Sequence, residues 1–405
     1  MKTYKHLFEQ MLLPETVRNC ALDAAQGKLK RTEVIAAFVN FDRTYDLVVS
    51  CAKDPDYKPC EDNTHQIIDG ANHKPRSIEK PMFCPEQILH HMIIEPFKPV
   101  LLNGLYEQVY GCLPPSTIVG KDGKTTVRKY GPHAAIHRLR KWVQTGEKVY
   151  VCETDIHHAY QSVHIPTLAA QMQRVIRDKE WMRITCQFLH YKPGDPSCDD
   201  LCGLILGHYT SPWFFNFYLK AFDHFAASLD GVKYLRFADN IFLVGNNKRK
   251  VHRALDAIRE YLHRELRLEL NGCTQVYRFE YQDRTGRVRG RAVNALGAVI
   301  HFNRVTLRKS ILMRMRRKAV KIKRKQKPTW HDGASMFSRL SWIRHTDTHT
   351  YYMKYIKPNI NTRQLKAKVR AHSRQLMPIA ADRRRIIYDG LEKSARIPGG
   401  TACRI

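Results

Sequence analysis

The sequence predicts an α+β fold in which a small antiparallel sheet is backed by helices. Residues 148–156 alternate in the manner of a β-strand and end at the carboxylate of Asp155. Residues 234–244 form two apolar arms around Asp239 and Asn240, which predicts a hairpin because Asp and Asn tolerate the dihedral angles of a tight turn. We expect helices over residues 167–190, 211–229 and 248–267.

Shorter elements surround these. Residues 85–100 have the apolar spacing of a helix, which we expect Pro96 and Pro99 to interrupt. From residue 304 onwards the chain becomes helical and basic. We expect short strands over residues 268–270, 276–279 and 295–302.

The composition is that of a folded protein with a substantial core. The chain has 405 residues, 43% of them hydrophobic, which suffices for two or three packed subdomains and excludes a disordered, collagen-like or mucin-like chain. The 11 cysteines include no Cys-x-x-Cys pair, so neither a disulfide framework nor a zinc module is indicated. The first residues lack the apolar core of a signal peptide, and no stretch approaches the ~18 apolar residues of a membrane helix. We therefore expect a cytoplasmic protein with no membrane partner.

The charge is strongly positive and unevenly distributed. Lys and Arg number 68 against 38 Asp and Glu, a net charge of +30. Residues 304–405 contain 27 of these cations and only 5 acidic residues. Such a balance predicts a polyanionic partner, most simply nucleic acid. A basic tail without a specific partner is the plainer alternative.

Two aspartates are candidates for a shared metal site. Asp155 ends one predicted strand and Asp239 lies at the tip of a later hairpin, so the two carboxylates converge if those strands are neighbours. Phosphoryl transfer by two divalent metals about 3.5–4 Å apart requires such a pair, because Mg²⁺ prefers carboxylate oxygens. Taken singly, each aspartate is more typical of a strand end or a turn than of a metal site.

The order and spacing of several motifs resemble those of reverse transcriptases. The palm motifs of that family are matched by DIHHAY at 155–160, GLILGHYTSP at 203–212 and FADN at 237–240. LELNGCTQV at 268–276 and Leu296-Gly297 look like the later palm motifs, and LRKSI at 307–311 looks like the start of a thumb. The resemblance spans about residues 75–360.

Within that family the sequence is most similar to the enzymes of diversity-generating retroelements. The likeness lies in LGHYTSPWFFNFYLKAFDHF, LELNGCTQVYRF and LRKSILMRMRRK, and in Leu206, which stands where most retroviral relatives have Gln. Pro212 is typical of reverse transcriptases in general, whereas this subgroup usually has Gln there. Members of the subgroup copy an RNA template with adenine-directed infidelity and work with a basic accessory protein.

The resemblance implies a right-hand polymerase fold with fingers, an antiparallel-sheet palm and a helical thumb. It implies an RNA-directed DNA polymerase that uses an RNA template, a DNA or RNA primer and deoxynucleotide triphosphates. The corresponding division of the chain is an N-terminal region with fingers at 1–100, a fingers/palm connection at 101–145, a palm at 146–303, a basic thumb at 304–372 and a basic tail at 373–405.

The resemblance also implies the catalytic centre. Asp155 and Asp239, with the backbone carbonyl of Ile156, are expected to hold two Mg²⁺ ions, with Mn²⁺ as the alternative ion. Asn240 stands where the family has a second aspartate. The missing negative charge should lower the affinity for cations and reduce activity or shift it toward Mn²⁺.

Four residues correspond to the nucleotide site. Tyr160 matches the steric gate, whose ring excludes a 2′-hydroxyl. Leu206 and Gly207 are expected to face the incoming base and sugar, and because leucine cannot hydrogen-bond a nucleotide it discriminates by shape alone. Arg76 resembles the fingers arginine that contacts the triphosphate. A core tyrosine and a surface arginine are the plainer interpretations of Tyr160 and Arg76.

The thumb helix is expected to bind nucleic acid. Leu307, Ile311, Met315, Ala319 and Ile322 fall on one apolar seam. The expected phosphate contacts on the other faces are Arg308, Lys309, Arg314, Arg316, Arg317 and Lys318. A solvated basic helix face is the alternative.

Two other functions fit the same motifs. The first is a reverse transcriptase of the retron, group II intron or phage-defence type. The second is a catalytically weakened RNA-binding scaffold of the same fold, which Asn240 and the altered fingers segment at 85–87 favour.

Overall fold

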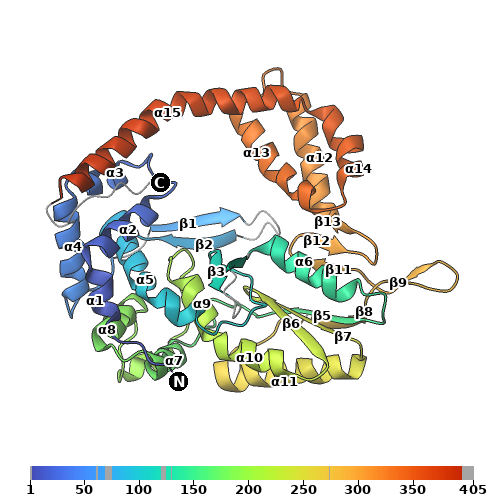
Figure 1. Cartoon of the computed structure of the whole chain (residues 1–405), viewed down its shortest axis with the longest axis horizontal. Helices are drawn as coiled ribbons and strands as arrows, with labels where there is room; N and C mark the ends of the chain where they lie inside the picture. The colour runs from blue at the N-terminus through green and yellow to red at the C-terminus, as the bar shows by residue number, and fades with distance from the viewer. Residues whose placement is uncertain are drawn as a thin grey trace.

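The computed structural model describes residues 2–60, 63–68, 75–119, 125–128, 130–272 and 274–394, and its fold is α+β as expected (Figure 1). The N-terminal part is mainly helical and carries two antiparallel hairpins. Its elements are α1 (Leu7–Leu12), α2 (Pro14–Ala25), α3 (Thr32–Val39), α4 (Phe41–Lys53), β1 (Asn63–Ile68), β2 (Pro75–Lys80), a π-helical turn (Phe83–Gln87), α5 (Ile88–Leu102), β3 (Ser116–Val119), β4 (Thr125–Arg128) and α6 (Pro132–Val143).

Helix α5 differs from its expectation, because it continues through Pro96 and Pro99 to Leu102. Proline removes one helical hydrogen bond and crowds the preceding turn, a cost of about 3 kcal/mol in an isolated helix. Here most side chains of α5 are buried, including Met92, Pro96 and Phe97. Packing of this broad face of the helix therefore offsets the proline penalty.

The centre of the molecule is a four-stranded antiparallel sheet in the order β6-β7-β5-β8. Its strands are β5 (Tyr150–Asp155), β6 (Val232–Phe237), β7 (Asn240–Gly245) and β8 (Gln275–Arg278). The surrounding helices are α7 (Ile165–Val175), α8 (Lys179–Phe188), a 3-10 turn (Pro196–Cys198), α9 (Ser211–Tyr218), α10 (Lys220–Ser228) and α11 (Lys248–Leu266).

Both faces of this sheet are buried. Cys152, Tyr234 and Leu243 point to one face, where α10 and α11 cover them. Val151 and Phe242 point to the other, toward α6 and the following sheet (Figure 1). The central strand β7 is accordingly almost continuously apolar, whereas β5, β6 and β8 also contain polar residues.

The C-terminal part begins with a small sheet and continues as helices. The segment expected as one strand over 295–302 is a hairpin, because Leu296 and Gly297 have φ of 51° and 90° and turn the chain back. The elements are β9 (Tyr281–Gln282), β10 (Val288–Arg289), β11 (Val293–Ala295), β12 (Ala298–Ile300), β13 (Val305–Leu307), α12 (Lys309–Lys323), α13 (Trp330–Leu340), a 3-10 turn (Ser341–His345), α14 (His349–Tyr351), a π-helical turn (Tyr352–Ile356), a 3-10 turn (Lys357–Asn359) and α15 (Thr362–Glu392). The apolar seam expected along α12 is confirmed: Met315, Ala319 and Ile322 are buried.

Helix α15 joins the C-terminal helices to the N-terminal ones (Figure 1). At its start Leu365 is buried against α13, and at its end Ile387 and Leu391 enter the N-terminal core beside α3. A Cβ on Gly390 would lie 1.7 Å from the carbonyl oxygen of Phe38, so only glycine permits this approach. The boundary placed after residue 372 falls inside this helix.

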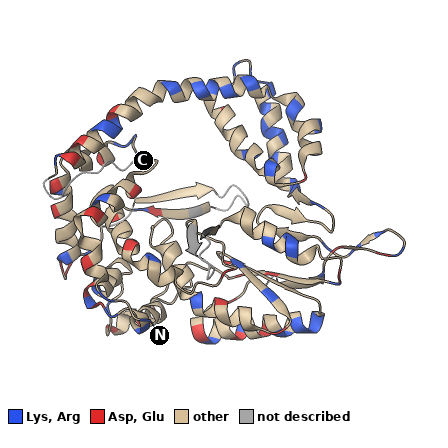
Figure 2. Cartoon of the chain, in the orientation of Figure 1, with Lys and Arg blue, Asp and Glu red and all other residues tan. Residues whose placement is uncertain are grey.

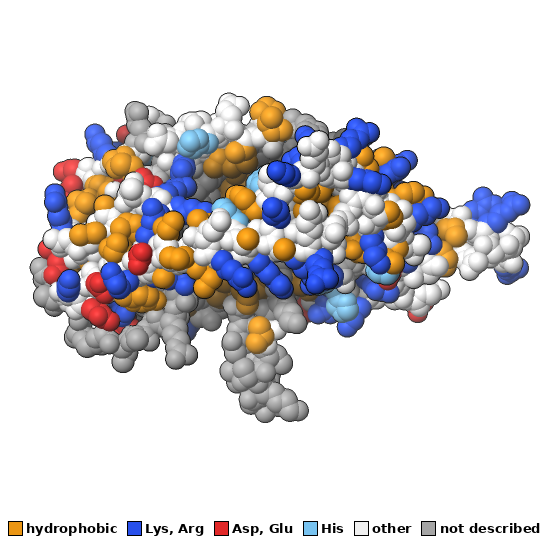
Figure 3. Space-filling model, turned by 90° about the horizontal axis from the view of Figure 1, so that it is seen from above, with side chains coloured by type: hydrophobic (Ala, Val, Ile, Leu, Met, Phe, Trp, Pro, Cys, Tyr) orange, Lys and Arg blue, Asp and Glu red, His pale blue; other side chains and the backbone are white. Residues whose placement is uncertain are grey.

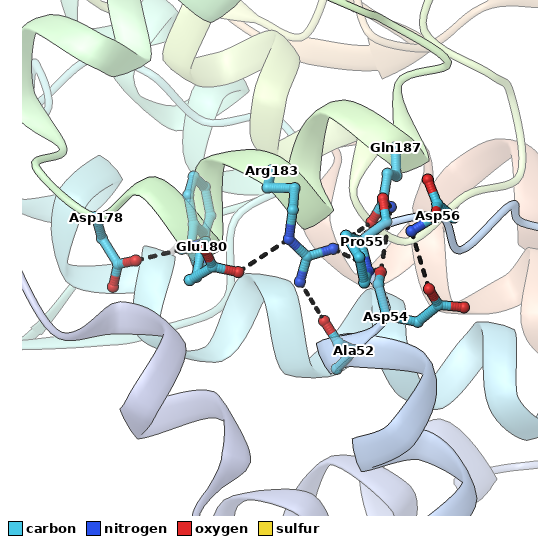
Figure 4. Close-up of polar contacts among 9 residues, drawn as sticks. Ala52, Asp54, Pro55, Asp56, Asp178, Glu180, Arg183 and Gln187 are labelled. Atoms are coloured by element: carbon cyan, nitrogen blue, oxygen red, sulfur yellow. Dashed lines mark hydrogen bonds and ion pairs between the residues drawn. The ribbon is translucent and has the colours of Figure 1, made fainter.

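Arg183 ties α4 to α8 (Figure 4). Its guanidinium donates to the carbonyl oxygens of Ala52 and Asp54, both at 2.7 Å, and to Glu180 at 2.9 Å. Gln187 donates to the same Asp54 carbonyl at 3.3 Å. The last carbonyls of a helix lack partners within it. These two side chains therefore cap α4 and fix it to α8.

None of the helices within the described ranges combines the length and the hydropathy that crossing a membrane requires.

Candidate active site

The structure brings Asp155 and Asp239 to the same end of the central sheet. In the antiparallel pair β5 and β7, Asp155 lies opposite Asn240. One residue further along, the backbone N–H of Ile156 donates to the carbonyl oxygen of Asp239 at 3.1 Å. Both aspartates are half-buried, so each carboxylate has one side in the protein and one toward solvent.

The turn that carries Asp239 is tightly constrained. Only Ala238 and Asp239 connect β6 to β7, and Ala238 adopts φ 52°, in the left-handed region that alanine rarely occupies. The guanidinium of Arg236 donates to the Ala238 carbonyl at 3.0 Å. A Cβ on Gly111 would lie 2.2 Å from the Ala238 nitrogen. The contacts of Arg236 and Gly111 with Ala238 therefore hold the turn in this unfavourable conformation.

A buried ion pair lies behind this turn. Arg236 and Asp223 are both fully buried and form two hydrogen bonds of 2.7 Å, one from Nε and one from Nη2. The hydroxyl of Tyr234 also donates to Asp223 at 2.7 Å. Asn216 accepts from Arg236 at 3.1 Å and donates to the carbonyl oxygen of Gly111 at 3.1 Å. The network thus connects α9, α10 and the residue 111 loop to the turn.

The pKa values of Tyr234 and Arg236 in this network are both raised. Burial, followed by the charge of Asp223, raises the pKa of Tyr234 well above its ordinary value, so its hydroxyl stays a donor. Burial alone would lower the pKa of Arg236, but Asp223 outweighs it and the pKa is raised. Arg236 therefore stays protonated, and its hydrogen bond to the Ala238 carbonyl is maintained.

We expect Gly111→Ala to lower the rate of any reaction at Asp239 by about 100-fold, because a displacement of about 1 Å has that effect on catalysis. Gly111 does not have a positive φ, so alanine strains the turn through the clash with Ala238 alone. Gly272→Ala is the matched control, because nothing lies within 4 Å of a Cβ there. The measurement is primer extension by each variant. Equal rates for Gly111→Ala and the unmodified protein would contradict this role.

A neutral amide contacts each of the two carboxylates. Asn240 Nδ2 donates to Asp239 Oδ1 at 2.8 Å. Asn271 donates through its backbone N–H to the Asp155 carbonyl at 2.8 Å and through Nδ2 to the Asp155 carboxylate at 3.3 Å. These amides orient the carboxylates and add no negative charge.

The donor set of this site fits a divalent cation. Hard oxygen ligands suit Mg²⁺, which takes one or two carboxylates and completes its shell with water and substrate phosphates. Asp155 and Asp239 supply two half-buried carboxylates. Within the described ranges, no cluster of three or more His, Cys, Asp or Glu side chains is arranged around a metal position.

A cavity of about 330 Å³ opens beside Asp155 and Asn240. Arg308 lines it and donates to the carbonyl oxygen of Asn294 at 3.1 Å. Of the expected phosphate contacts, Arg308 is therefore the one that shares a cavity with a catalytic candidate. A guanidinium in this place can contact the backbone of a strand that reaches the carboxylates.

Tyr160 packs as a fixed ring near the turn. Its ring stacks on that of Phe215 with centroids 4.8 Å apart. Burial, then Cys112 and then the charge of Asp239 raise its pKa above the ordinary value. The influence of Asp239 places the Tyr160 hydroxyl in the neighbourhood of the candidate catalytic carboxylate, and the stacking holds the ring in one orientation.

Leu206 and Gly207 contact the hairpin β1–β2. The backbone N–H of Glu79 donates to the Leu206 carbonyl at 2.8 Å. Gly207 has φ 113°, and a Cβ there would lie 2.0 Å from the Glu79 carbonyl oxygen and 2.8 Å from Ile78 Cγ2. Gly207 is thus required both for its dihedral angle and for this close approach. Arg76 belongs to the same strand β2, but its side chain lies outside the described part of the structure.

The remaining expected phosphate contacts belong to α12. Arg316 lies over the ring of Tyr355, with 5.1 Å between the guanidinium carbon and the ring centroid. Lys318 donates to the buried carboxylate of Asp332 at 2.9 Å, so it has a partner within the protein. The others are exposed or half-exposed on α12: Lys309, Arg314 and Arg317.

Asp332 is a structural carboxylate of the C-terminal helices. It caps α13 by accepting from Thr329, and it pairs with Lys318 and with Lys325 at 2.7 Å. Burial opposes its ionisation, but Lys325 and Lys318 outweigh this and lower its pKa well below the ordinary range. Its contribution to stability is therefore present above the ordinary carboxyl pKa of about 3.9 and is lost as the pH falls below it.

We expect Asp332→Asn to lower the free energy of unfolding by about 2 kcal/mol at pH 6, because two charged hydrogen bonds are weakened. The difference between the variant and the unmodified protein should shrink as the pH falls below about 4. Urea denaturation between pH 3 and pH 6 measures it. A difference that stays constant over this range would show that the charge of Asp332 is not involved.

Sequence patterns alone did not predict a role for Arg236, Asp223, Gly111 or Asn271. A signal for the ion pair exists, because Arg236 and Asp223 each interrupt an otherwise apolar segment. Charges in such segments are almost never buried unless they are paired. Asn271 lies within the motif LELNGCTQV, for which no individual role was expected, and no local pattern marks a role for Gly111.

A four-stranded antiparallel sheet bearing these carboxylates, with helices and hairpins before it and a helical C-terminal part, is the architecture of right-hand polymerases. The family model described as reverse transcriptase (RNA-dependent DNA polymerase) matches residues 89–297, just over half of the chain. The chain belongs to the reverse transcriptase family. No curated protein matches it.

Two telomerase structures are among the similar solved structures. Apo telomerase from Candida tropicalis, truncated from its C-terminal domain, has 11% identity and a TM-score of 0.39, and the match covers 66% of this chain and 60% of that one. Telomerase from Candida albicans in complex with a TWJ fragment of telomeric RNA has 10% identity and a TM-score of 0.41, and the match covers 76% of this chain and 56% of that one. The chain thus spans between half and two thirds of their length.

Proposed function

We propose that the protein is an RNA-directed DNA polymerase that makes cDNA on an RNA template by two-metal nucleotidyl transfer, in a diversity-generating retroelement. The observation that carries the proposal is the register of β5 against β7, which sets Asp155 opposite Asn240 and beside Asp239. Two carboxylates at one end of a sheet are the protein ligands that this reaction requires.

In the proposed reaction, the 3′-hydroxyl of the primer attacks the α-phosphate of a deoxynucleotide, and pyrophosphate leaves. Asp155, Asp239 and the Ile156 carbonyl would hold two Mg²⁺ ions, which stabilise the attacking and leaving oxygens when bound. Asn271 and Asn240 keep the carboxylates in place. In this proposal residues 146–303 form the palm and residues 304–372 the thumb.

Substrate choice rests on shape. A Tyr160 ring held against Phe215 would clash with a ribose 2′-hydroxyl and so favour deoxynucleotides. Leu206 offers the incoming base no polar side-chain atom. A site that discriminates by shape alone achieves only about 10- to 200-fold selectivity per contact. Low fidelity, as in diversity-generating retroelements with their basic accessory protein, is consistent with this side chain.

The proposal is tested by primer extension on an RNA template, in Mg²⁺ and separately in Mn²⁺, with sequencing of the products. We expect extension that EDTA abolishes and errors concentrated at template adenines. Extension with errors spread evenly over the four bases would instead favour the retron, group II intron or phage-defence type. Tight RNA binding without extension in either metal would overturn the proposal and favour the RNA-binding scaffold.

We expect Asn240→Asp to lower the Mg²⁺ concentration for half-maximal extension by about five- to tenfold. The Asn240 amide lies 2.8 Å from the Asp239 carboxylate, so the added charge falls at the metal position. A unit charge at about 4 Å is worth about 1 kcal/mol even in a watery environment, and more for a divalent ion. A titration of extension rate against Mg²⁺ measures the change, and an unaltered midpoint would exclude this effect of Asn240.

A further inference from the structure

The middle of α15, between the two ends that pack on the rest of the protein, is largely exposed to solvent. Leu365 is buried against α13 and Ile387 against the N-terminal core, whereas the residues from 373 to 375 and from 377 to 379 are exposed. A helix that is exposed on all sides lacks the packing that normally stabilises helices. Its side chains are therefore free to have another role.

The side of α15 that faces the thumb is well defined. Leu365 is buried there, Val369 lies beside Gly333 of α13, and His372 stacks on Trp330 with ring centroids 3.9 Å apart. These positions are three or four residues apart, so they share one face of the helix. The remaining circumference of this stretch faces away from α13.

A stripe of cations occupies that outer face. Its members follow the same three- and four-residue spacing, and all are exposed: Arg363, Lys366, Arg370 and Arg374, here named the outer stripe. Lys and Arg side chains form a band across the molecule where α15 crosses it in Figure 3 and gather on α12 and α15 in Figure 2. At 1.5 Å per residue, the outer stripe is about 17 Å long.

The outer stripe is not neutralised within the protein. Residues 362–381 contain five Lys or Arg and no Asp or Glu. Over the described ranges, no ion pair is found for any member of the outer stripe. Like charges four residues apart, such as Lys366 and Arg370, destabilise a helix by about 0.2–0.5 kcal/mol per pair. A helix face that keeps these charges without neutralising them is suited to an external polyanion.

We propose that the outer stripe of α15 is a second RNA-binding surface, separate from the cleft at Asp155 and Asp239. The phosphates of an RNA segment outside the cleft lie along the stripe and neutralise its charges. RNA fits better than an acidic protein, because the exposed residues between 363 and 374 include no large apolar side chain. Protein interfaces usually have an apolar core, whereas a phosphate backbone is held by charge alone.

The inference goes beyond the proposed polymerase function, because the binding it describes requires no catalysis. A short primed template that fills only the cleft should not reach the outer stripe. A long template RNA should reach both. The two surfaces can therefore be distinguished by the length of RNA that each variant binds.

The experiment compares two triple variants that lose the same charge. Lys366→Gln, Arg370→Gln and Arg374→Gln remove most of the outer stripe, and glutamine preserves helix propensity. The matched control changes Lys248, Arg249 and Arg253 to Gln, three exposed residues of α11, on the opposite side of the molecule (Figure 1). RNA affinity is measured by fluorescence anisotropy with a long single-stranded RNA at several salt concentrations, and single-nucleotide addition with a short primed template.

For the outer-stripe triple we expect affinity for the long RNA to fall by about 10- to 100-fold at 100 mM salt. The slope of log affinity against log salt should shrink by about 2, since each lost phosphate contact removes about 0.7. Single-nucleotide addition on the short template should be unchanged, and the α11 control should change none of these quantities.

Three results would overturn the inference. The first is an unchanged affinity for long RNA, and the second is an equal loss of RNA affinity in both triple variants. The third comes from a parallel measurement with polyglutamate: if the outer-stripe triple loses more affinity for polyglutamate than for RNA, the partner is an acidic protein instead. If the unmodified protein extends no primer while the outer-stripe triple still loses RNA affinity, the proposed function fails and this inference stands.

Discussion

Asp239→Ala should abolish primer extension, with a loss of at least about 10³-fold. The carboxylate is one of two expected to hold the catalytic metals, and that role corresponds to about 4 kcal/mol of transition-state stabilisation or more. Asp239→Asn is the sharper variant, because an amide oxygen can still accept the hydrogen bond that Asn240 donates at 2.8 Å. Extension should be lost in both variants, while RNA binding and unfolding remain those of the unmodified protein.

The control for this loss is Asp230→Asn. Asp230 is an exposed aspartate just before β6 and pairs with Lys250 at 2.7 Å. Exposed pairs contribute about 0–1 kcal/mol, so this variant should extend primers normally. Extension by Asp239→Ala at the unmodified rate would remove the polymerase proposal. A fold shared with polymerases would then be serving RNA binding alone.

Arg236→Met should have the largest effect on stability. It leaves the fully buried carboxylate of Asp223 without its bidentate partner, and breaking a buried pair in this way costs about 3–5 kcal/mol. It also removes the donor that holds the Ala238 carbonyl at 3.0 Å. Urea denaturation and primer extension should therefore both show a large loss.

A double variant separates the two roles of Arg236. Arg236→Met combined with Asp223→Leu removes both charges, and replacing a buried pair with apolar residues is often neutral or stabilising. Much of the lost stability should return. Primer extension should remain about 100-fold slower than in the unmodified protein, because no donor then holds the turn at Ala238. Recovery of both stability and extension would show that Arg236 acts only on stability.

Much of the catalytic sheet could be predicted from local patterns. The strand at 148–156 and the hairpin at 234–244 were expected from alternation and turn residues, and β5, β6 and β7 are confirmed within one or two residues. The residue of the two-residue connection that adopts the left-handed conformation is Ala238, however, and not Asp239 or Asn240. The apolar seam of α12 could also be predicted, because its helical spacing is visible within a short stretch of sequence.

What escaped prediction depends on contacts between distant segments. The continuity of α5 through two prolines depends on neighbours that bury most of its side chains. The roles of Gly111 and Asn271 come from the loops that pass beside Ala238 and Asp155. The helix expected over 167–190 is two helices, because the chain becomes extended at Ile176 and restarts with Asp178 as a cap. None of these features has a period that a sequence window could detect.

Helix α15 also has a mechanical consequence. Because it is fixed to α13 at one end and to α3 at the other, the C-terminal helices and the N-terminal helices cannot swing apart independently. A larger separation between these two groups of helices must bend α15 or move Gly390 away from the Phe38 carbonyl, which it approaches without an intervening side chain. Helix α15 therefore bridges the two ends of the molecule through contacts at both of its termini. Entry of a bulky folded RNA between these ends would require that the contact with α13 or the contact with α3 open.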